Sequence, residues 1–175
     1  VESLPVNESI KTRTGDFLRH IENYKTSLRN FGKAGIEVVI YNFMPVLDWV
    51  RTDLHYKLPD GAEALRYDPV MFAAFDIFAL KRPNAAKSFD PHTAQEAEKF
   101  WTGLGVAGQQ KYTEQILSLF PGVKWDLGVE GLRAMLAAYT DIDTPKLKEN
   151  LRLFLKEVVP VAEASGVRMA IHPDD

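Results

Sequence analysis

The chain has 175 residues, of which 46% are hydrophobic and 26% charged, a composition typical of a globular domain that can bury a core. A net charge of -3 without any block of lysine and arginine argues against nucleic-acid binding, and the lack of cysteine excludes disulfides, thiolate metal sites and cysteine nucleophiles within the chain. No apolar run approaches the roughly 20 residues of a membrane span and no signal peptide is visible, so we expect a cytoplasmic protein without a membrane partner.

A strand, a helix and a second strand are predicted at the start of the chain. Residues 1–6 form an apolar run typical of the end of a strand. Apolar residues then recur at spacings of three and four, which predicts a helix over Thr14–Phe31 with Thr14 as its N-cap, ended by Gly32 and Gly35. β-Branched residues follow and predict a strand over 36–43.

Residues 44–143 are too many for a plain loop after a strand, which usually has about 2–6 residues. They contain helical patterns of their own over 92–102, 112–120 and 129–139. Because this insertion follows the C-terminal end of a predicted strand, we expect a mostly helical cap on the face where barrel enzymes place their active sites.

The glycines of residues 103–108 match the dinucleotide-binding pattern by letter. That motif needs a preceding strand, so that its glycines bring a helix N-terminus to the pyrophosphate. Residues 94–101 have a helical pattern instead. We therefore expect a flexible loop between helices that binds no nucleotide.

A helix and a strand are predicted at the end of the chain. Thr144 is expected to cap the helix, Pro160 to kink it and Gly166 to end it, and an apolar strand follows over 167–171. Strands and helices therefore alternate, which predicts an α/β fold with a parallel sheet and right-handed crossovers. The three predicted strands should be neighbours, with the two long helices on one outer side of them.

His172 is the first candidate for chemistry, because it follows the last predicted strand and precedes Pro173 and two carboxylates. A strand histidine is often only a satisfied polar group. The tip of a parallel strand is nevertheless where barrel enzymes place metal ligands, and imidazole is the commonest ligand. One imidazole cannot hold a catalytic metal, so other ligands must come from elsewhere. Both interpretations of His172 stay open at this point.

A second candidate group follows the second predicted strand. Asn42 is in phase with the inward residues of that strand and is expected at the mouth of a barrel. Arg51 is suited to a bidentate grip on a carboxylate, and Trp49 to stacking on a sugar chain. The alternative is that Trp49 only anchors the loop and that Arg51 pairs with Asp48 or Asp53.

Two long tracts, Asn42–Trp49 and Met169–Asp175, resemble the mannonate dehydratase family. Shorter tracts share the resemblance: Val1–Val6, Arg13–Asp16, Tyr24–Lys25, Ser27–Asn30, Arg51–Asp53 and Leu58–Gly61. The resemblance covers both ends of the chain and the early insertion, and it is poor from about residue 94 to 129.

The resemblance implies a TIM barrel similar to xylose isomerase, of which this chain would carry about three strands. It implies a hydro-lyase that converts D-mannonate to 2-keto-3-deoxy-D-gluconate in hexuronate catabolism with Mn²⁺ or Fe²⁺. His172 would be a metal ligand, and Asn42, Trp49 and Arg51 would face the substrate. The catalytic residues are unknown and expected beyond residue 175, so we expect a fragment that lacks both natural ends. The complete protein is expected to be a homo-oligomer.

Two alternatives stay open. A sugar isomerase or epimerase of similar barrel fold would share the metal site but interconvert a neutral carbonyl sugar. A non-catalytic fragment would only bind a partner or assemble through its open barrel edges. Comparing mannonate with neutral ketoses as substrates separates the first alternative from a dehydratase.

Overall fold

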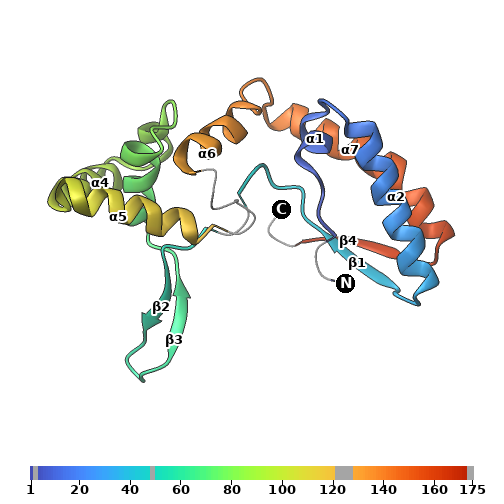
Figure 1. The fold of residues 1–175 in the computed structure, drawn as a ribbon, viewed down its shortest axis with the longest axis horizontal. Coiled ribbons are helices and arrows are strands. Elements are labelled where there is room, and N and C mark those ends of the chain that lie inside the picture. The colour runs from blue at the N-terminus through green and yellow to red at the C-terminus, as the bar shows by residue number, and fades with distance from the viewer. Residues whose placement is uncertain (2–3, 48–49, 121–127, 173–175) are drawn as a thin grey trace. The chain divides into compact units, whose positions relative to one another are not determined.

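The computed structural model describes residues 1, 4–47, 50–120 and 128–172. The chain divides into two compact units (Figure 1). Residues 1–45 and 138–175 form the first, called the sheet unit, and residues 46–137 form the second, called the inserted unit. In the part of the chain that the structure describes, no helix has the length and apolar character needed to cross a membrane.

The sheet unit contains two strands that are far apart in the sequence. β1 (Val38–Tyr41) pairs in parallel with β4 (Arg168–Ile171), and the register joins Val38 to Arg168 and Tyr41 to Ile171. Both strands lie inside the predicted ranges 36–43 and 167–171, and their predicted parallel pairing is confirmed.

The first predicted strand, residues 1–6, is not a regular strand where the structure describes it. The amide of Ile40 donates to the carbonyl of Val1 at 2.9 Å, and the amide of Leu4 donates to the carbonyl of Ile40 at 3.0 Å. The segment therefore runs alongside β1 in the same direction. In a regular parallel ladder the two residues that bond to Ile40 are two positions apart, whereas Val1 and Leu4 are three apart, so this pairing is irregular.

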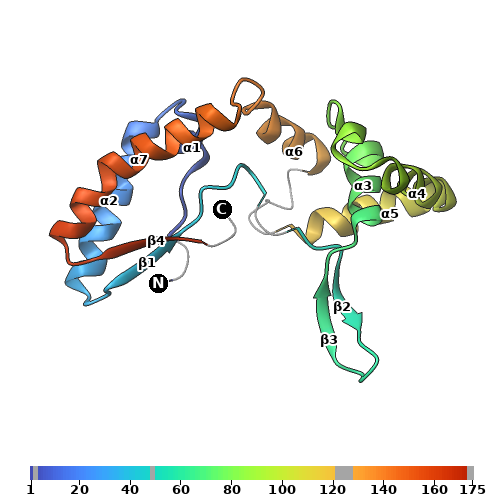
Figure 2. The same ribbon diagram turned by 180° about the vertical axis from the view of Figure 1, so that it is seen from behind.

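Two long helices cover one side of the strand pair, as predicted (Figures 1 and 2). They are α2 (Phe17–Lys33) and α7 (Thr144–Ala164). The core between helices and strands centres on Phe154, which is fully buried and lies 5.1 Å from the ring of Tyr24, 6.2 Å from Tyr41 and 5.8 Å from Phe43. Ring clusters of this kind contribute beyond the area that they bury.

Of the two glycines predicted to end α2, Gly32 is wrong, because it lies inside the helix, whereas Gly35 does follow the helix end at Lys33. A Cβ atom at this position would lie 2.2 Å from the carbonyl oxygen of Ser165, just after α7. Gly32 is therefore needed for the close approach of the two chain segments. The turn after the helix is made by Gly35, whose φ of 73° suits glycine.

The predicted helix caps are also corrected. The residue before α2 is Asp16, which makes no side-chain cap bond, and Thr14 instead contacts the hydroxyl of Thr12 at 2.7 Å. Asp143, not Thr144, caps α7 by accepting a hydrogen bond from the amide of Lys146 at 2.9 Å. A carboxylate is at least as good a cap as a hydroxyl, so the neighbouring aspartate takes the position in α7. The same helix continues past Pro160 to Ala164.

The inserted unit is mostly helical. Its helices are α3 (Pro69–Ala74), α4 (Pro91–Gly103), α5 (Gly105–Ser118) and α6 (Gly128–Ala137), with a π-helical turn at Phe75–Ala79 and a 3₁₀ turn at Ala85–Ser88. The predicted helices over 92–102, 112–120 and 129–139 correspond to α4, the second half of α5, and α6.

The loop expected over residues 103–108 is absent. Only Leu104 separates α4 from α5, and Gly108 lies inside α5. Gly105, with a φ of 62°, makes the sharp change of direction between the two helices. Since a helix and not a strand precedes these glycines, the structure supports the rejection of the dinucleotide motif.

A β-hairpin, which the sequence analysis did not predict, begins the inserted unit. β2 (Asp53–Lys57) pairs antiparallel with β3 (Glu63–Arg66). The amide of Leu58 donates to the carbonyl of Ala62 at 2.9 Å, and Gly61 takes a φ of 88° in the turn. The turn sequence Pro59-Asp60-Gly61 was the local signal for a hairpin.

Candidate functional site

His172 and Asn42 lie side by side at the ends of β4 and β1. The register joins Tyr41 to Ile171, so each strand continues directly into one of the two candidates. The amide of His172 donates to the carbonyl of Tyr41 at 2.9 Å, which continues the ladder past the last paired residues. The backbone therefore fixes the two candidate residues beside each other.

The two residues also share one face of the strand pair. In β1, Val39 and Tyr41 are buried under the helices, with 0% and 5% of their surface exposed. Successive side chains alternate between faces, so Asn42 belongs to the opposite face. In β4, Met169 packs into the same core, which assigns His172 to that opposite face too. Both residues are half-buried.

The donor set tests whether these residues fit a metal ion. The imidazole of His172 is a suitable ligand for Mn²⁺ or Fe²⁺. Among residues 1, 4–47, 50–120 and 128–172, however, no three histidine, aspartate or glutamate side chains come together in a way that could hold a metal. Asp174 and Asp175 lie outside the described residues. This part of the chain therefore offers one candidate ligand and no metal centre of its own.

Arg51 and Trp49 belong to the inserted unit. Trp49 lies outside the described residues, so its expected contact with substrate stays a prediction. Arg51 is half-buried and precedes Thr52, which is fully buried at the base of the hairpin. A grouping of Arg51 with Asn42 and His172 also stays a prediction.

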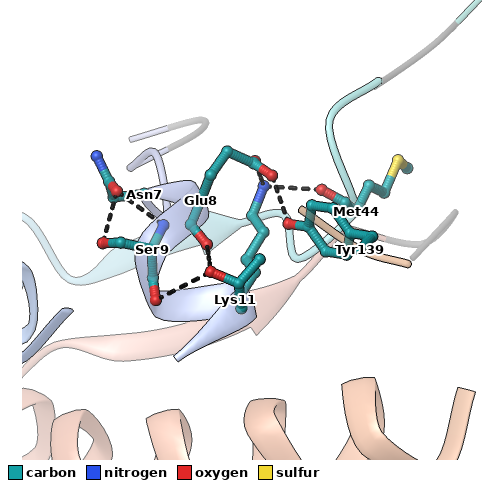
Figure 3. Close-up of polar contacts among 7 residues, drawn as sticks. Asn7, Glu8, Ser9, Lys11, Met44 and Tyr139 are labelled. Carbon is teal, nitrogen blue, oxygen red and sulfur yellow. Dashed lines mark hydrogen bonds and ion pairs between the residues drawn. The ribbon is translucent and has the colours of Figure 1, made fainter. Parts of the chain in front are cut away.

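Sequence reasoning missed a polar cluster around the short helix α1 (Glu8–Thr12), shown in Figure 3. The ammonium group of Lys11 donates to the carboxylate of Glu8 at 2.6 Å and to the carbonyl of Met44 at 2.7 Å. The hydroxyl of Tyr139 donates to the other carboxylate oxygen of Glu8. The available signal was Asn7, a favourable N-cap, followed by opposite charges three residues apart.

The charges and burial of these side chains favour the hydrogen bonds that join them. Burial raises the pKa of Tyr139, and the neighbouring carboxylate of Glu8 raises it further, so the hydroxyl keeps its proton and remains a donor. The side chain of Lys11 is only 10% exposed. A buried ammonium group is stable where it meets a carboxylate and a carbonyl, as it does here.

Comparison with known proteins points to one family. The family model described as D-mannonate dehydratase (UxuA) matches residues 1–175. Proteins named mannonate dehydratase from Marinomonas sp. and from Chromohalobacter salexigens are each 46% identical over 175 residues. Each match covers 100% of this chain and 45% of the relative, so the chain spans about half the length of these curated relatives.

A solved structure supports the same relationship. The crystal structure of mannonate dehydratase from Streptococcus suis serotype 2 superimposes with a TM-score of 0.61 at 35% sequence identity. The match covers 99% of this chain and 36% of that chain.

Proposed function

Because the chain belongs to the D-mannonate dehydratase family, we propose that the whole protein removes water from D-mannonate to give 2-keto-3-deoxy-D-gluconate. The observation that carries this proposal is the family match over residues 1–175, together with 46% identity to relatives of that name. These relatives are about twice as long as the chain, so the activity is proposed for the whole protein and not for the 175 residues alone.

The proposed fold of the whole protein is a TIM barrel. The parallel pair β1 and β4, joined through α7 and covered by helices on one side, supports this proposal. In such barrels the C-terminal ends of the strands form the active site. Asn42 and His172 lie at these ends and point away from the helical layer, which is the direction of a barrel interior.

Each candidate residue has a proposed role. His172 would contribute one ligand to Mn²⁺ or Fe²⁺, and the remaining ligands would come from outside the described residues. When bound, the metal would stabilise negative charge on substrate oxygens. The amide of Asn42 would bind substrate hydroxyls. Arg51 would hold the sugar-acid carboxylate through paired hydrogen bonds, and Trp49 would pack against the carbon chain.

The reaction explains why a cation is needed near the carboxylate. Dehydration removes a proton from the carbon beside the carboxylate and expels hydroxide from the next carbon. As the proton leaves, negative charge spreads onto the carboxylate oxygens. A guanidinium group such as that of Arg51, placed there in advance, stabilises this charge without reorganisation. The groups that transfer the proton are not assigned to this chain.

Three variants of the full-length protein test the proposal. His172→Ala should lower metal content and dehydration of D-mannonate together, because a first metal ligand is lost. Arg51→Ala should mainly raise KM and leave metal content unchanged. His92→Ala, an exposed histidine at the start of α4, is the matched control and should change neither property.

Two outcomes contradict the proposal. Full turnover of a neutral ketose without turnover of D-mannonate would identify an isomerase or epimerase instead. A His172→Ala variant with wild-type metal content and activity would reduce His172 to a structural residue at the end of β4.

A further inference from the structure

The polar cluster around α1 joins three parts of the sheet unit at one end of the strands (Figure 3). α1 follows the segment that runs alongside β1, so it lies at the end of the strands from which Asn42 and His172 emerge. Met44 is two residues beyond Asn42. The chain passes into the inserted unit after Pro45 and returns to the sheet unit at Ala138. Met44 therefore lies just before the first connection, and Tyr139 just after the second.

One carboxylate holds this arrangement together. The two oxygens of Glu8 accept from the ammonium group of Lys11 and from the hydroxyl of Tyr139. Lys11 then reaches the carbonyl of Met44 at 2.7 Å. We call these three side chains with the Met44 carbonyl the α1 clasp. The side chain of Lys11 is 10% exposed and that of Glu8 is 39% exposed. Charge-assisted hydrogen bonds such as these are shorter and stronger than bonds between neutral groups.

α1 is itself held firmly, so the clasp has a fixed base. The side chain of Asn7 accepts a hydrogen bond from the amide of Ser9 at 2.9 Å and caps the helix. Ile10 is 2% exposed and belongs to the core under α2 and α7. The side chain of Asn150, on α7, is buried and donates to the carbonyl of Lys11 at 2.7 Å. The backbone that carries Lys11 is thus tied to the helical layer.

We propose that the α1 clasp is a positioning device for the substrate site, in which Lys11 and Glu8 fix the chain after β1 and Tyr139 fixes the returning chain. The inference rests on the proposed function for its effect on substrate, since Asn42 is the residue that the clasp would orient. None of the three side chains needs to touch substrate. Their role is to hold the Met44 carbonyl, and hence the segment from Asn42 to Pro45, in one place.

A second lysine in the same unit provides a matched control. Lys25 donates to Glu22 at 2.9 Å and to Glu157 at 2.8 Å, and its side chain is 13% exposed, close to the 10% of Lys11. Its contacts join α2 to α7 and end on side chains of helices. Lys25→Met therefore removes a comparable ion-pair network without releasing a backbone carbonyl near Asn42.

The test compares Lys11→Met with Lys25→Met in the full-length protein. Lys11→Met should raise KM for D-mannonate about tenfold or more, because small displacements of positioning groups are costly, while metal content stays at the wild-type level. Amide hydrogen exchange should become faster over residues 42–44. Lys25→Met should leave KM and the exchange of these residues unchanged.

The exchange measurement keeps the inference testable apart from the proposed function. If the full-length protein does not turn over D-mannonate, the proposed function fails, and exchange over residues 42–44 still decides whether the clasp exists. Equal exchange in Lys11→Met and Lys25→Met would overturn the clasp. Faster exchange with an unchanged KM would overturn its link to Asn42.

Tyr139→Phe serves as a second, milder variant that removes one hydroxyl and is expected to fold. It should speed exchange at 138–140 and raise KM by a smaller factor than Lys11→Met. Wild-type exchange at these residues would overturn the part of the proposal that concerns the returning chain.

Discussion

The two β-structures of this chain differ in how they are supported. β1 and β4 are far apart in the sequence, pair in parallel, and have one face buried under α2 and α7. β2 and β3 are close neighbours in the sequence and pair antiparallel, with all residues of both strands exposed or half-buried. Large apolar side chains remain in water on and beside the hairpin, among them Leu65, 58% exposed, and Tyr67, 50% exposed.

The difference shows where rigid placement of functional groups is possible. A two-stranded hairpin alone is marginally stable in water, since few apolar contacts offset the entropy of ordering it. The parallel pair is stabilised by a shared core, so the residues that follow its strands, Asn42 and His172, are held in place. The hairpin depends instead on contacts at its base, where Thr52 is fully buried.

The largest effect on stability is expected at alkaline pH, because each of the two units contains a tyrosine whose ionisation disfavours its folded state. Burial raises the pKa of Tyr24 in the sheet unit and of Tyr112 in the inserted unit. In the unfolded chain both ionise near the ordinary tyrosine pKa of about 10. Their contribution to stability is therefore complete below about pH 10 and is lost as pH rises above it. Circular dichroism and tyrosinate absorbance should show unfolding and ionisation together.

A control variant separates the two tyrosines. Tyr24→Phe removes one ionising group whose hydroxyl has no hydrogen-bond partner in the described part of the chain. The loss of stability with rising pH should then be shallower. Ionisation of both tyrosines near pH 10 in a chain that stays folded would contradict the expectation.

The next largest effect is expected for Phe154→Ala in the core that supports β1 and β4. Phe154 is fully buried and contacts three other rings, so the substitution should lower the free energy of unfolding by about 3–5 kcal/mol. Leu65→Ala on the hairpin, which removes an exposed side chain, should change it by less than about 0.5 kcal/mol. Urea unfolding measures both values. Equal losses in the two variants would remove the difference between the two β-structures.

A smaller effect is expected for Thr52→Ala at the base of the hairpin. The hydroxyl of Thr52 donates to the carbonyl of Arg66 at 3.1 Å and accepts from the amide of Asp68 at 2.9 Å. Its loss leaves the amide of Asp68 without this partner, whereas the carbonyl of Arg66 keeps its bond from the amide of Thr52 at 2.9 Å, so the cost should be about 0.5–1.5 kcal/mol. Hydrogen exchange should rise across β2 and β3. Thr52→Ser retains the hydroxyl and should restore most of the protection, and protection that survives in Thr52→Ala would show that the base does not hold the hairpin.

The smallest effect is expected for the exposed charges on the hairpin. Hydrogen bonds from Lys57 and, to a lesser extent, His55 lower the pKa of Glu63. The small stability that this shift contributes is present at neutral pH and is lost as the solution becomes acidic. Lys57→Gln should move the pKa of Glu63 back toward its ordinary value while the midpoint of urea unfolding hardly changes. An NMR titration checks the shift, and His55→Gln, as the comparison variant, should give a smaller one.

Local periodicity was sufficient to predict the long helices and the two paired strands. The apolar spacing before Phe31 and after Thr144, and the β-branched run at 36–43, reflect side chains that must face one core, so they are visible in the sequence. The same patterns, with the family resemblance, led to Asn42 and His172, and the register confirms that these residues are neighbours.

Other features depended on contacts that the sequence does not display. Position 32 inside α2 requires glycine because the carbonyl of Ser165 approaches it, and Asp143 replaces Thr144 as a cap because its carboxylate accepts from the amide of Lys146. In the α1 clasp, Glu8 meets Tyr139 across most of the length of the chain. Amphipathic faces follow from residues a few positions apart, so the sequence by itself determined them. Close approaches and polar clusters join distant residues, and only the tertiary structure decided them.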